Sequence, residues 1–292
     1  MLDEVQKCFI EIVAAVSRHG NAMVVGPDRN EIHEALSRNG LVDMTRVTIV
    51  GIDTNDTWAR DFGPVTLVDR DGHPTLLDFR FNGWGLKFAA NHDNLVTMRL
   101  QSLGHLKGTY VNRRGFVLEG GSIESDGHGT LLTTSTCLLS PNRNDEMTRD
   151  QIGQYLKHEL HVDHLLWLDH GFLEGDDTDS HVDTLARLAP GDTIIYVRCD
   201  NPADVHYDEL KAMEEELRNF RTSRGNPFNL IGLPMVDPIE DDGERLPATY
   251  ANFLILNDAV LMPVYNQPAN DDLAVKMMKI AFPDHTIETV DC

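Results

Sequence analysis

The feature that most constrains the fold of this chain is the recurrence of one amphipathic helix among several short strand-like runs, roughly once per 50–60 residues. Apolar residues at helical spacing predict helices from Leu2, near Asn91, after Thr148, between 203 and 220, and after Asn270 as an N-cap. Such a recurrence predicts a repeated α/β module. Modules of this kind that close into a ring leave one shared central cavity.

Short runs rich in apolar residues fill the intervals between the helices and predict strands. Val65–Val68 and Leu76–Phe79 flank the turn Arg70–Gly72 and predict a hairpin. The other predicted strands cover 22–25, 47–51, 75–81, 116–118, 129–134, 164–168, 193–197, 253–256 and 260–262. Asp237–Pro247 combines prolines with like charges and predicts a long surface loop rather than a domain boundary.

The charge balance bounds the partners. The chain has 25 Lys and Arg residues against 47 Asp and Glu residues, a formal net charge of −22. Nucleic acids and anionic membranes are polyanions, so this charge argues against them as main partners and is compatible with a small cationic molecule. No run approaches the roughly 20 apolar residues that span a bilayer, and charged residues interrupt the apolar positions of the N-terminus, unlike a signal peptide. Four widely spaced cysteines without a CxxC pair indicate a reducing cytoplasm.

The first candidate site is Asp56-Thr-Trp-Ala-Arg-Asp-Phe-Gly-Pro64. Asp61 is expected at a turn before Gly63, with its carboxylate facing a cavity that Trp58 walls. A carboxylate beside an indole face is suited to binding a flat cation. The alternative is a core Trp beside a structural ion pair, because such pairs also resemble functional sites.

The second candidate site is Glu119-Gly-Gly-Ser122. Two glycines at a strand end are typical of a tight turn or a bulge. The functional interpretation is that Gly120 and Gly121 allow a close backbone approach beside Glu119, as a buried acid.

The third candidate site lies in the acidic segment Glu174–Asp183. On a strand, His181 and Asp183 would share one face, and a carboxylate beside an imidazole favours the charged form that serves in acid/base catalysis. A solvated acidic loop is the alternative. A calcium site fits poorly, because the EF-hand register places Val182 where glycine is required and Leu188 where glutamate is required.

Other polar residues receive structural interpretations at this stage. Asn142-Arg143-Asn144 is expected to cap the helix after Thr148. The remaining histidines, His206 among them, are interpreted as surface or satisfied core residues without a paired acid. The cysteines Cys8, Cys137 and Cys199 lie on a predicted amphipathic helix or near apolar strands, where a buried structural role is typical.

Taken together, these motifs resemble the agmatine deiminase and bacterial-type peptidylarginine deiminase family. The matching elements are Trp-x-Arg-Asp-x-Gly-Pro, Glu-Gly-Gly-Ser, Asn-Arg-Asn, Asp-x-Thr-Asp-x-His-x-Asp and Pro247-Ala-Thr-Tyr-Ala-Asn-Phe253, in this order. The match runs from about Asn21 to Cys292. The resemblance implies an α/β pentein fold, a propeller of five ββαβ-like modules around a central active site. One departure is Ser180, where the family usually has glycine before the histidine.

The resemblance also implies a reaction. The family hydrolyses a guanidinium to a ureido group with release of ammonia, and agmatine would give N-carbamoylputrescine without a cofactor or metal. Asp61 and Asp183 would hold the guanidinium by charge-assisted hydrogen bonds. His181 would act as acid and then base, and Glu119 would support the site. The implied substrate wall includes Asp56 and Trp58.

The family's nucleophile is a cysteine thiolate that forms a covalent thiouronium intermediate. It lies in a Gly-Gly-x-x-His-Cys type motif that residues 1–292 do not contain. We therefore expect a single deiminase domain over 1–292, with the nucleophile beyond Cys292 and a further segment before Leu2. Peptidyl-arginine or free arginine are alternative substrates, and a catalytically inactive guanidine-binding homologue is the alternative of another class. Oligomeric state stays open, with a homo-oligomer among the alternatives.

Overall fold

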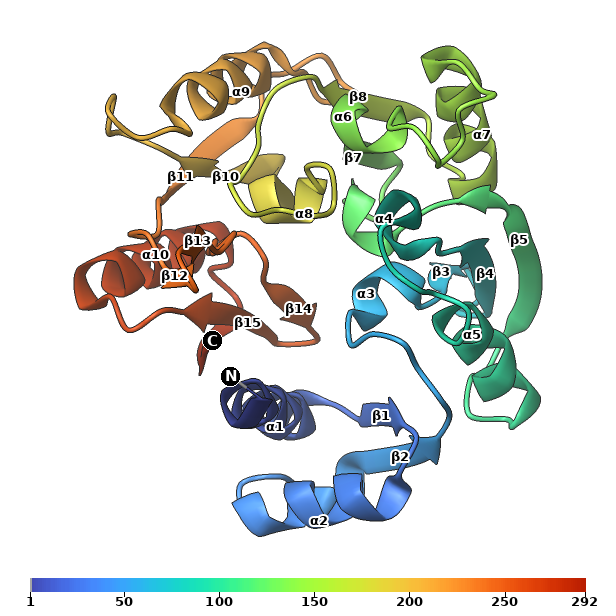
Figure 1. The fold of residues 1–292 in the computed structure, drawn as a ribbon. Helices are drawn as coiled ribbons and strands as arrows, with labels where there is room; N and C mark the ends of the chain where they lie inside the picture. The colour runs from blue at the N-terminus through green and yellow to red at the C-terminus, as the bar shows by residue number, and fades with distance from the viewer. Residues whose placement is uncertain (1) are drawn as a thin grey trace.

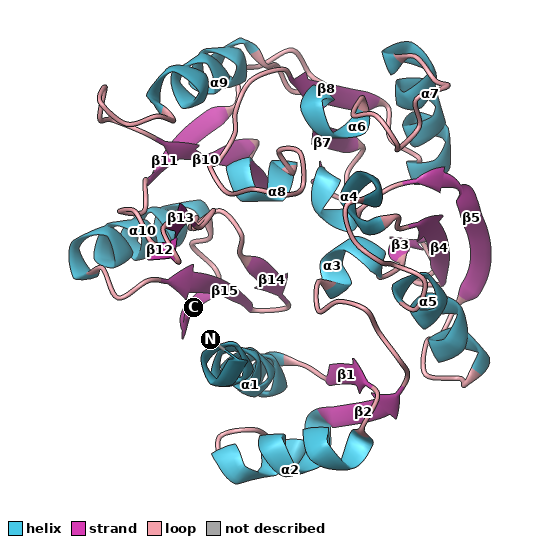
Figure 2. Cartoon of the chain, viewed as in Figure 1, coloured by secondary structure: helices cyan, strands magenta, loops and turns pink. Residues whose placement is uncertain are grey.

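The chain passes around the middle of the molecule, so that its first helix lies beside its last strand (Figure 1). The computed structural model describes residues 2–292. Within these residues, one sheet of two strands and four sheets of three strands surround the centre, and a two-residue hairpin lies apart from them. Helices alternate with the strands along the chain (Figure 2). The fold is the mixed α/β fold that the sequence predicts.

Four of the sheets share one construction. An antiparallel hairpin leads into a helix, and the third strand returns parallel to the second. The first two such units are β3 (Val65–Val68), β4 (Pro74–Arg80), α5 (Asp93–Ser102), β5 (Thr109–Val117), and β6 (Ile123–Ser125), β7 (Thr130–Thr134), α7 (Arg149–Leu160), β8 (His164–Leu168). The other two are β9 (Ala186–Ala189), β10 (Thr193–Arg198), α9 (Tyr207–Asn219), β11 (Asn229–Pro234), and β14 (Leu254–Leu256), β15 (Ala259–Val264), α10 (Pro268–Ala281), β16 (Thr286–Asp291).

The first unit of the chain is simpler. It consists of β1 (Ala22–Gly26), α2 (Arg29–Asn39) and β2 (Val47–Gly51), with the two strands parallel. A short 3-10 turn, Met44–Arg46, precedes β2, and α1 (Leu2–His19) packs against β1 and β16. The described residues thus contain four complete ββαβ units and one βαβ unit.

Short helices lie at the inner ends of the strands, toward the centre in Figure 1. These are α3 (Ala59–Phe62), α4 (Gly83–Leu86), the 3-10 turn Gly120–Ser122, α6 (Ser135–Leu138) and α8 (Val182–Leu185). Both α3 and α8 pack against the turn Gly120–Ser122. Side chains from three different units are therefore brought together at the centre.

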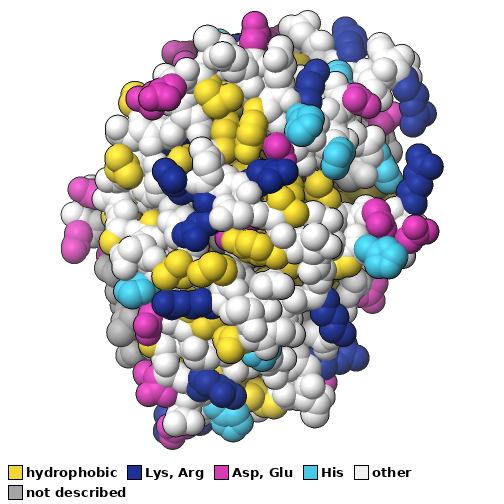
Figure 3. Space-filling view, turned by 90° about the vertical axis from the view of Figure 1, so that its right-hand side faces the viewer, with side chains coloured by type: hydrophobic (Ala, Val, Ile, Leu, Met, Phe, Trp, Pro, Cys, Tyr) yellow, Lys and Arg dark blue, Asp and Glu magenta, His cyan; other side chains and the backbone are white. Residues whose placement is uncertain are grey.

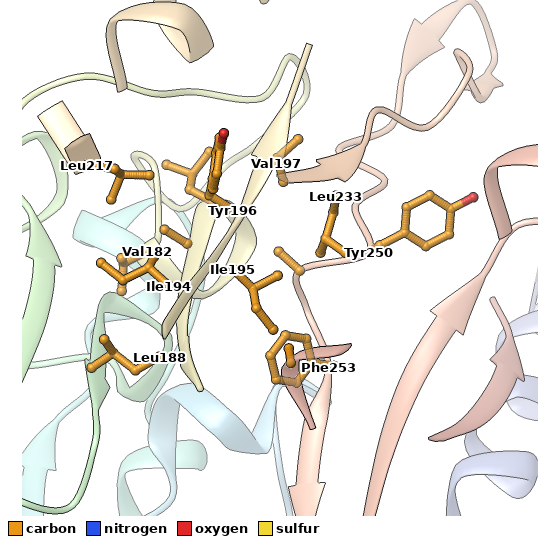
Figure 4. Packing of buried hydrophobic residues seen from close by; sticks show 14 of the residues in the cluster. Val182, Leu188, Ile194, Ile195, Tyr196, Val197, Leu217, Leu233, Tyr250 and Phe253 are labelled. Carbon is orange, nitrogen blue, oxygen red and sulfur yellow. The ribbon is translucent and has the colours of Figure 1, made fainter. Parts of the chain in front are cut away.

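The largest apolar cluster joins the last two ββαβ units and anchors α8 (Figure 4). Val182 and Leu185 of α8 are fully buried against Ile194 and Ile195 of β10. Burying a side chain of this size contributes about 1.5–3 kcal/mol. The residues that flank His181 and Asp183 are thus held by the core rather than by solvent-exposed loops.

Several predicted elements need correction. The last helix starts at Pro268 with Gln267 as its N-cap, so Asn270 lies in the first turn. The strand predicted at 116–118 is the end of the longer β5, which starts at Thr109. The loop 237–247 contains the short strands β12 (Glu240–Asp241) and β13 (Glu244–Arg245). The hairpin β3–β4 and the capping box that starts α7 form as predicted.

The surface mixes both signs of charge. On the face that carries β5 and α7, Lys and Arg side chains lie among Asp, Glu and His side chains (Figure 3). The negative net charge is therefore not gathered into one patch on this face. Among the described residues, no helix combines the length and the apolar character needed to cross a bilayer.

Candidate active site

A glycine turn after β5 allows three polar side chains to converge. The backbone N–H of Gly121 donates to Oδ1 of Asp61 at 2.9 Å. A methyl group at this position would lie 2.6 Å from Nδ1 of His181, 2.8 Å from Oδ1 of Asp61 and 2.9 Å from Oδ2 of Asp183. These distances are shorter than real methyl contacts, so the arrangement requires glycine. The predicted close backbone approach is confirmed.

Asp61 lies on α3, is 7% exposed and accepts a hydrogen bond at each oxygen. Gly121 donates to Oδ1 at 2.9 Å and Nε1 of Trp84 donates to Oδ2 at 3.1 Å. The indole that contacts this carboxylate is thus Trp84, which the sequence analysis missed. Trp58 has a side chain that is 59% exposed at the N-cap of α3, and its role as a substrate wall stays a prediction. Asp56 is half-buried, with its carboxylate accepting from the next backbone N–H, and also stays a prediction.

Trp84 reaches Asp61 because its backbone takes an unusual turn. Gly83, Trp84, Gly85 and Leu86 all have positive φ, from 54° to 80°. For a residue with a side chain this left-handed conformation costs about 1–2 kcal/mol. A tryptophan between two glycines is the sequence signal that would have identified the turn.

His181 and Asp183 lie at the start of α8, not on a strand as predicted. His181 is the N-cap of α8, and Asp183 is in its first turn. The strand prediction failed because Asp179 and Ser180 have φ values of 65° and 63°, which turns the chain sharply before the helix. The left-handed backbone at Ser180 explains why glycine suits this position.

Glu119 faces His181 from the other side of the imidazole. Nδ1 of His181 lies 3.6 Å from Oδ1 of Asp61, and Nε2 lies 3.8 Å from Oε2 of Glu119. Burial disfavours the charged imidazole, but Asp61, Cys137 and Glu119 together outweigh this effect, so the pKa of His181 lies well above its ordinary value. Burial would also raise the pKa of Glu119, but the facing imidazole and Arg143 lower it. The geometry therefore favours a charged pair at the centre.

Of the three carboxylates at the centre, Asp183 is the one whose burial is not offset by a hydrogen bond from another described residue. It is 5% exposed, and no hydrogen bond to its side chain is present among the described residues; its nearest cation is Arg60, with Nε at 3.9 Å. Burial therefore raises the pKa of Asp183 to about 6. A buried carboxylate without a donor is suited to a cationic ligand that supplies N–H groups. Nε2 of His181 is likewise buried without a hydrogen-bond partner.

Arg143 also belongs to the site, although the sequence analysis placed it in a helix cap. Its Nε donates to Oε1 and Oε2 of Glu119 at 3.1 and 3.0 Å. Its Nη1 donates to Asp179 at 2.5 Å, and both Arg143 and Glu119 have fully buried side chains. The cap of α7 is Thr148 itself. An Asn-Arg-Asn tripeptide carries no local signal for this pairing, which forms across 24 residues of sequence.

Cys137 lies nearer the site than the sequence suggested. It is buried as predicted, but its Sγ is 3.9 Å from Oε2 of Glu119. Burial raises the pKa of this thiol. A thiol that is hard to ionise is a poor nucleophile.

Two groups of described residues bring three metal-binding atoms together: Glu119, Cys137 and His181 within 4.8 Å, and the exposed turn residues Asp69, Asp71 and His73. The buried group adjoins the Arg143 guanidinium, which repels a cation. The exposed turn uses the Asp69 carboxylate to accept its own backbone N–H groups.

In the acidic segment before His181, the carboxylates of Asp176 and Asp179 already accept hydrogen bonds. The Asp176 carboxylate accepts from the backbone of Thr178 and of Ser180 at 3.0 and 2.8 Å. Asp179 accepts from Lys87 and Arg143. These carboxylates build the turn rather than offering free oxygens to calcium.

One further histidine was misjudged. His206 is buried and does have a paired acid, with Nδ1 2.6 Å from Oδ1 of Asp204. Its Nε2 accepts the backbone N–H of Glu174 at 2.8 Å. Both ring nitrogens are used, so the pair is structural.

Comparison with known proteins gives consistent matches over the chain. The model of the Porphyromonas-type peptidyl-arginine deiminase family matches residues 1–292. The agmatine deiminase of Stutzerimonas stutzeri is 30% identical, over 98% of this chain and 82% of that protein. A solved Porphyromonas gingivalis protein with the provisional name arginine deiminase is 49% identical, with a TM-score of 0.93 over 100% of this chain and 85% of that one. The agmatine deiminase of C. jejuni, solved with substrate bound, is 38% identical, with a TM-score of 0.89 over 99% of this chain and 82% of that one.

Proposed function

Because the chain belongs to the Porphyromonas-type peptidyl-arginine deiminase family, with the α/β fold of the pentein deiminases, we propose that it hydrolyses the guanidinium of agmatine to N-carbamoylputrescine and ammonia. The matched deiminases support a hydrolase that acts on guanidino C–N bonds. Agmatine as the substrate, and the mechanism below, are the finer parts of the proposal.

The observation that carries the proposal is the convergence around Gly121. Oδ1 of Asp61, Oδ2 of Asp183 and Nδ1 of His181 all lie within 2.6–2.9 Å of where a methyl group on Gly121 would be, so the three polar atoms lie close together beside this glycine. A guanidinium offers N–H donors in one plane, and two neighbouring carboxylates can accept them in pairs. Asp183 gains most, because its buried carboxylate has no other hydrogen-bond donor among the described residues.

In this proposal a cysteine thiolate attacks the guanidinium carbon. The charged His181 then gives its proton to the departing nitrogen, and ammonia leaves a thiouronium intermediate. The neutral imidazole next takes a proton from water, which attacks the same carbon. The C–S bond then breaks, the thiolate leaves, and the new hydroxyl gives its proton to solvent as the ureido product forms. Throughout these steps the Glu119 carboxylate stays near Nε2 of His181, where it stabilises the charged imidazole. We do not assign the thiolate to Cys137, because burial raises the pKa of its thiol.

The direct test is ammonia release from agmatine by the full-length enzyme and by His181→Ala. We expect the variant to lose the activity, since the proton donor for the leaving group is removed. Full activity in His181→Ala would refute the assignment. A thiol alkylator should abolish turnover, whereas a chelator should leave it unchanged.

Two alternatives are separated by the same assay. Arginine and a peptidyl-arginine, compared with agmatine by kcat/KM, decide between substrates of the same class. The Porphyromonas gingivalis match favours including arginine in this comparison. A guanidine-binding protein without catalysis would bind agmatine in calorimetry and release no ammonia.

The remaining properties are proposals of the same kind. We place the enzyme in a cytoplasm and treat residues 1–292 as one catalytic domain. Light scattering of the purified protein would measure its molar mass and so test whether it forms a homo-oligomer.

A further inference from the structure

Arg143 is a buried cation that connects two parts of the candidate site. Its guanidinium is fully buried. It donates to two carboxylates and one backbone carbonyl. Nε donates to both oxygens of Glu119, Nη1 to Oδ2 of Asp179, and Nη2 to the carbonyl of Thr178 at 2.9 Å. One side chain thus connects Glu119, which faces the imidazole, with the turn that precedes His181.

The first part that depends on this cation is Glu119. This side chain is fully buried, and an isolated carboxylate in such a place would take up a proton. Arg143 and His181 are the cations that face it and lower its pKa. Removal of the guanidinium would leave one cation for the two carboxylates Glu119 and Asp61.

The second part is the turn that presents His181. Asp179 and Ser180 both hold the left-handed conformation, which costs about 1–2 kcal/mol for each residue with a side chain. Such strain persists only where the surroundings enforce it. Arg143 binds the side chain of Asp179 and the carbonyl of Thr178, directly within this turn.

We propose that Arg143 is a positioning residue for the deiminase reaction, because one buried guanidinium both pairs with Glu119 and holds the left-handed turn before His181. The inference rests on the proposed function. It adds a residue that contacts neither the expected substrate position nor the reacting atoms.

The test uses Arg143→Gln with Lys87→Met as the matched control. Lys87 binds the same Asp179 carboxylate and the carbonyl of Asp177, both at 2.7 Å, but its side chain is 38% exposed. Exposed ion pairs contribute little, so Lys87→Met should keep kcat within about twofold of the parent enzyme. Arg143→Gln should lower kcat at least about 100-fold with a smaller change in KM, because displaced catalytic groups affect turnover. Its acid limb in the pH profile of kcat/KM should move to higher pH.

Two further variants separate the parts of the proposal and protect against a failure to fold. Arg143→Lys restores the charge beside Glu119 without the fork, so the acid limb should return while kcat recovers only in part. Asp179→Asn keeps the pair with Glu119 but loosens the turn, so kcat should fall while the acid limb stays in place.

Hydrogen exchange gives a readout without substrate. The amides of Ser180 and His181 donate within the turn, at 2.8 and 3.0 Å. Exchange over 176–183 should increase in Arg143→Gln and Asp179→Asn, but not in Lys87→Met. Unchanged exchange together with parental kinetics in Arg143→Gln would overturn the inference. If the parent enzyme deiminates none of the three substrates, the proposed function fails, and the exchange experiment still decides whether Arg143 holds the turn.

A different observation carries a second inference. Sγ of Cys8 on α1 lies 3.1 Å from Sγ of Cys292 after β16, although 284 residues separate them. Cys8 is half-buried and Cys292 is exposed, whereas Cys137 and Cys199 are buried. Apolar contacts between α1 and the sheet β14–β16 hold the two segments together, and Lys7 and Asp291 form an ion pair beside them.

The geometry points to Cys8 and Cys292 as a dithiol that a low-molecular-weight disulfide oxidises to an intramolecular disulfide. The thiolate of one cysteine attacks oxidised glutathione, and one glutathione thiolate leaves. The second cysteine then attacks the mixed disulfide, and a second glutathione leaves. Two protein thiols lose two electrons, which reduce one oxidised glutathione, and the two leaving thiolates take up the two protons.

Oxidised glutathione added to the folded chain tests this inference by intact mass and peptide mapping. We expect the loss of two hydrogens and a Cys8–Cys292 cross-linked peptide, with Cys199→Ser as a control that behaves like the parent. The melting temperature should rise by several degrees, since the cross-link joins residues 284 positions apart and closes a long loop. Cys8→Ser should retain one glutathionyl group on Cys292. A parent chain that keeps its mass, or that carries glutathione on both cysteines, would overturn the inference.

Discussion

Replacing Asp183 by asparagine should make the protein more stable at neutral pH and less active. Burial raises the pKa of Asp183 to about 6, against 3.8 for an unperturbed aspartate. Between these two values the unfolded chain has lost a proton that the folded chain still holds, so stability falls as pH rises and the loss is complete above about pH 6. One pKa unit corresponds to about 1.36 kcal/mol, which gives a penalty of about 3 kcal/mol at pH 7.5 and about 1.5 kcal/mol at pH 5.

The assay is urea unfolding of the parent and Asp183→Asn at both pH values. The free energy of unfolding should favour the variant by about 3 kcal/mol at pH 7.5 and by about half of that at pH 5. At an unfolding entropy of about 2.1 cal/mol/K per residue, the larger value raises the melting temperature by about 5 °C. Any pH-independent effect of the new amide group on stability is the same at both pH values. The difference between the two pH values therefore reports the titration of Asp183 alone.

Activity should change in the opposite direction. The asparagine offers one carbonyl oxygen and no charge to the guanidinium, so kcat/KM should fall at least about tenfold. Asp163→Asn is the matched control, because this carboxylate is exposed before β8, and both stability and activity should match the parent. A variant that is less stable at pH 7.5, or whose stability difference is the same at both pH values, would refute the reasoning.

Three further substitutions test the site. Gly121→Ala should lower kcat/KM by about 100-fold, because its methyl group would collide with the side chains of Asp61, His181 and Asp183. Gly115→Ala on β5 is the control: open space surrounds this position, so ammonia release should match the parent. Ser180→Gly should raise the free energy of unfolding by about 0.5–1 kcal/mol in urea, since glycine accepts the left-handed backbone, and a lower value would contradict the strain argument. Trp84→Phe keeps the aromatic packing and removes the donor to Asp61; we expect kcat/KM to fall about tenfold, and an unchanged value would show that the hydrogen bond is dispensable.

Sequence reasoning succeeded where the signal was local. The capping box at Thr148 predicts the start of α7 because the side chain and backbone of one turn interact directly. The turn Arg70–Gly72 predicts the hairpin for the same reason. Glu119 could be proposed as a buried acid because the two following glycines admit a close backbone approach.

It failed where the partner comes from another part of the chain. The pairing of Arg143 with Glu119 and the hydrogen bond of Trp84 to Asp61 join residues more than 20 positions apart. Neither has a spacing that periodicity can detect. The strand predicted through His181 was wrong because the turn before it depends on left-handed residues held by contacts with other loops.

The sequence alone determined the α/β modules and the candidate residues Asp61, Glu119, His181 and Asp183. Helix and strand patterns and the family motifs depend on residues that are close together in the sequence, so they can be recognised without a structure. Only the tertiary structure decided their protonation and their distances. Burial and the proximity of opposite charges set these properties, and both arise when modules remote in sequence close around one centre. The same closure places Arg143, which the sequence alone assigned to a helix cap, beside Glu119 as a buried cation.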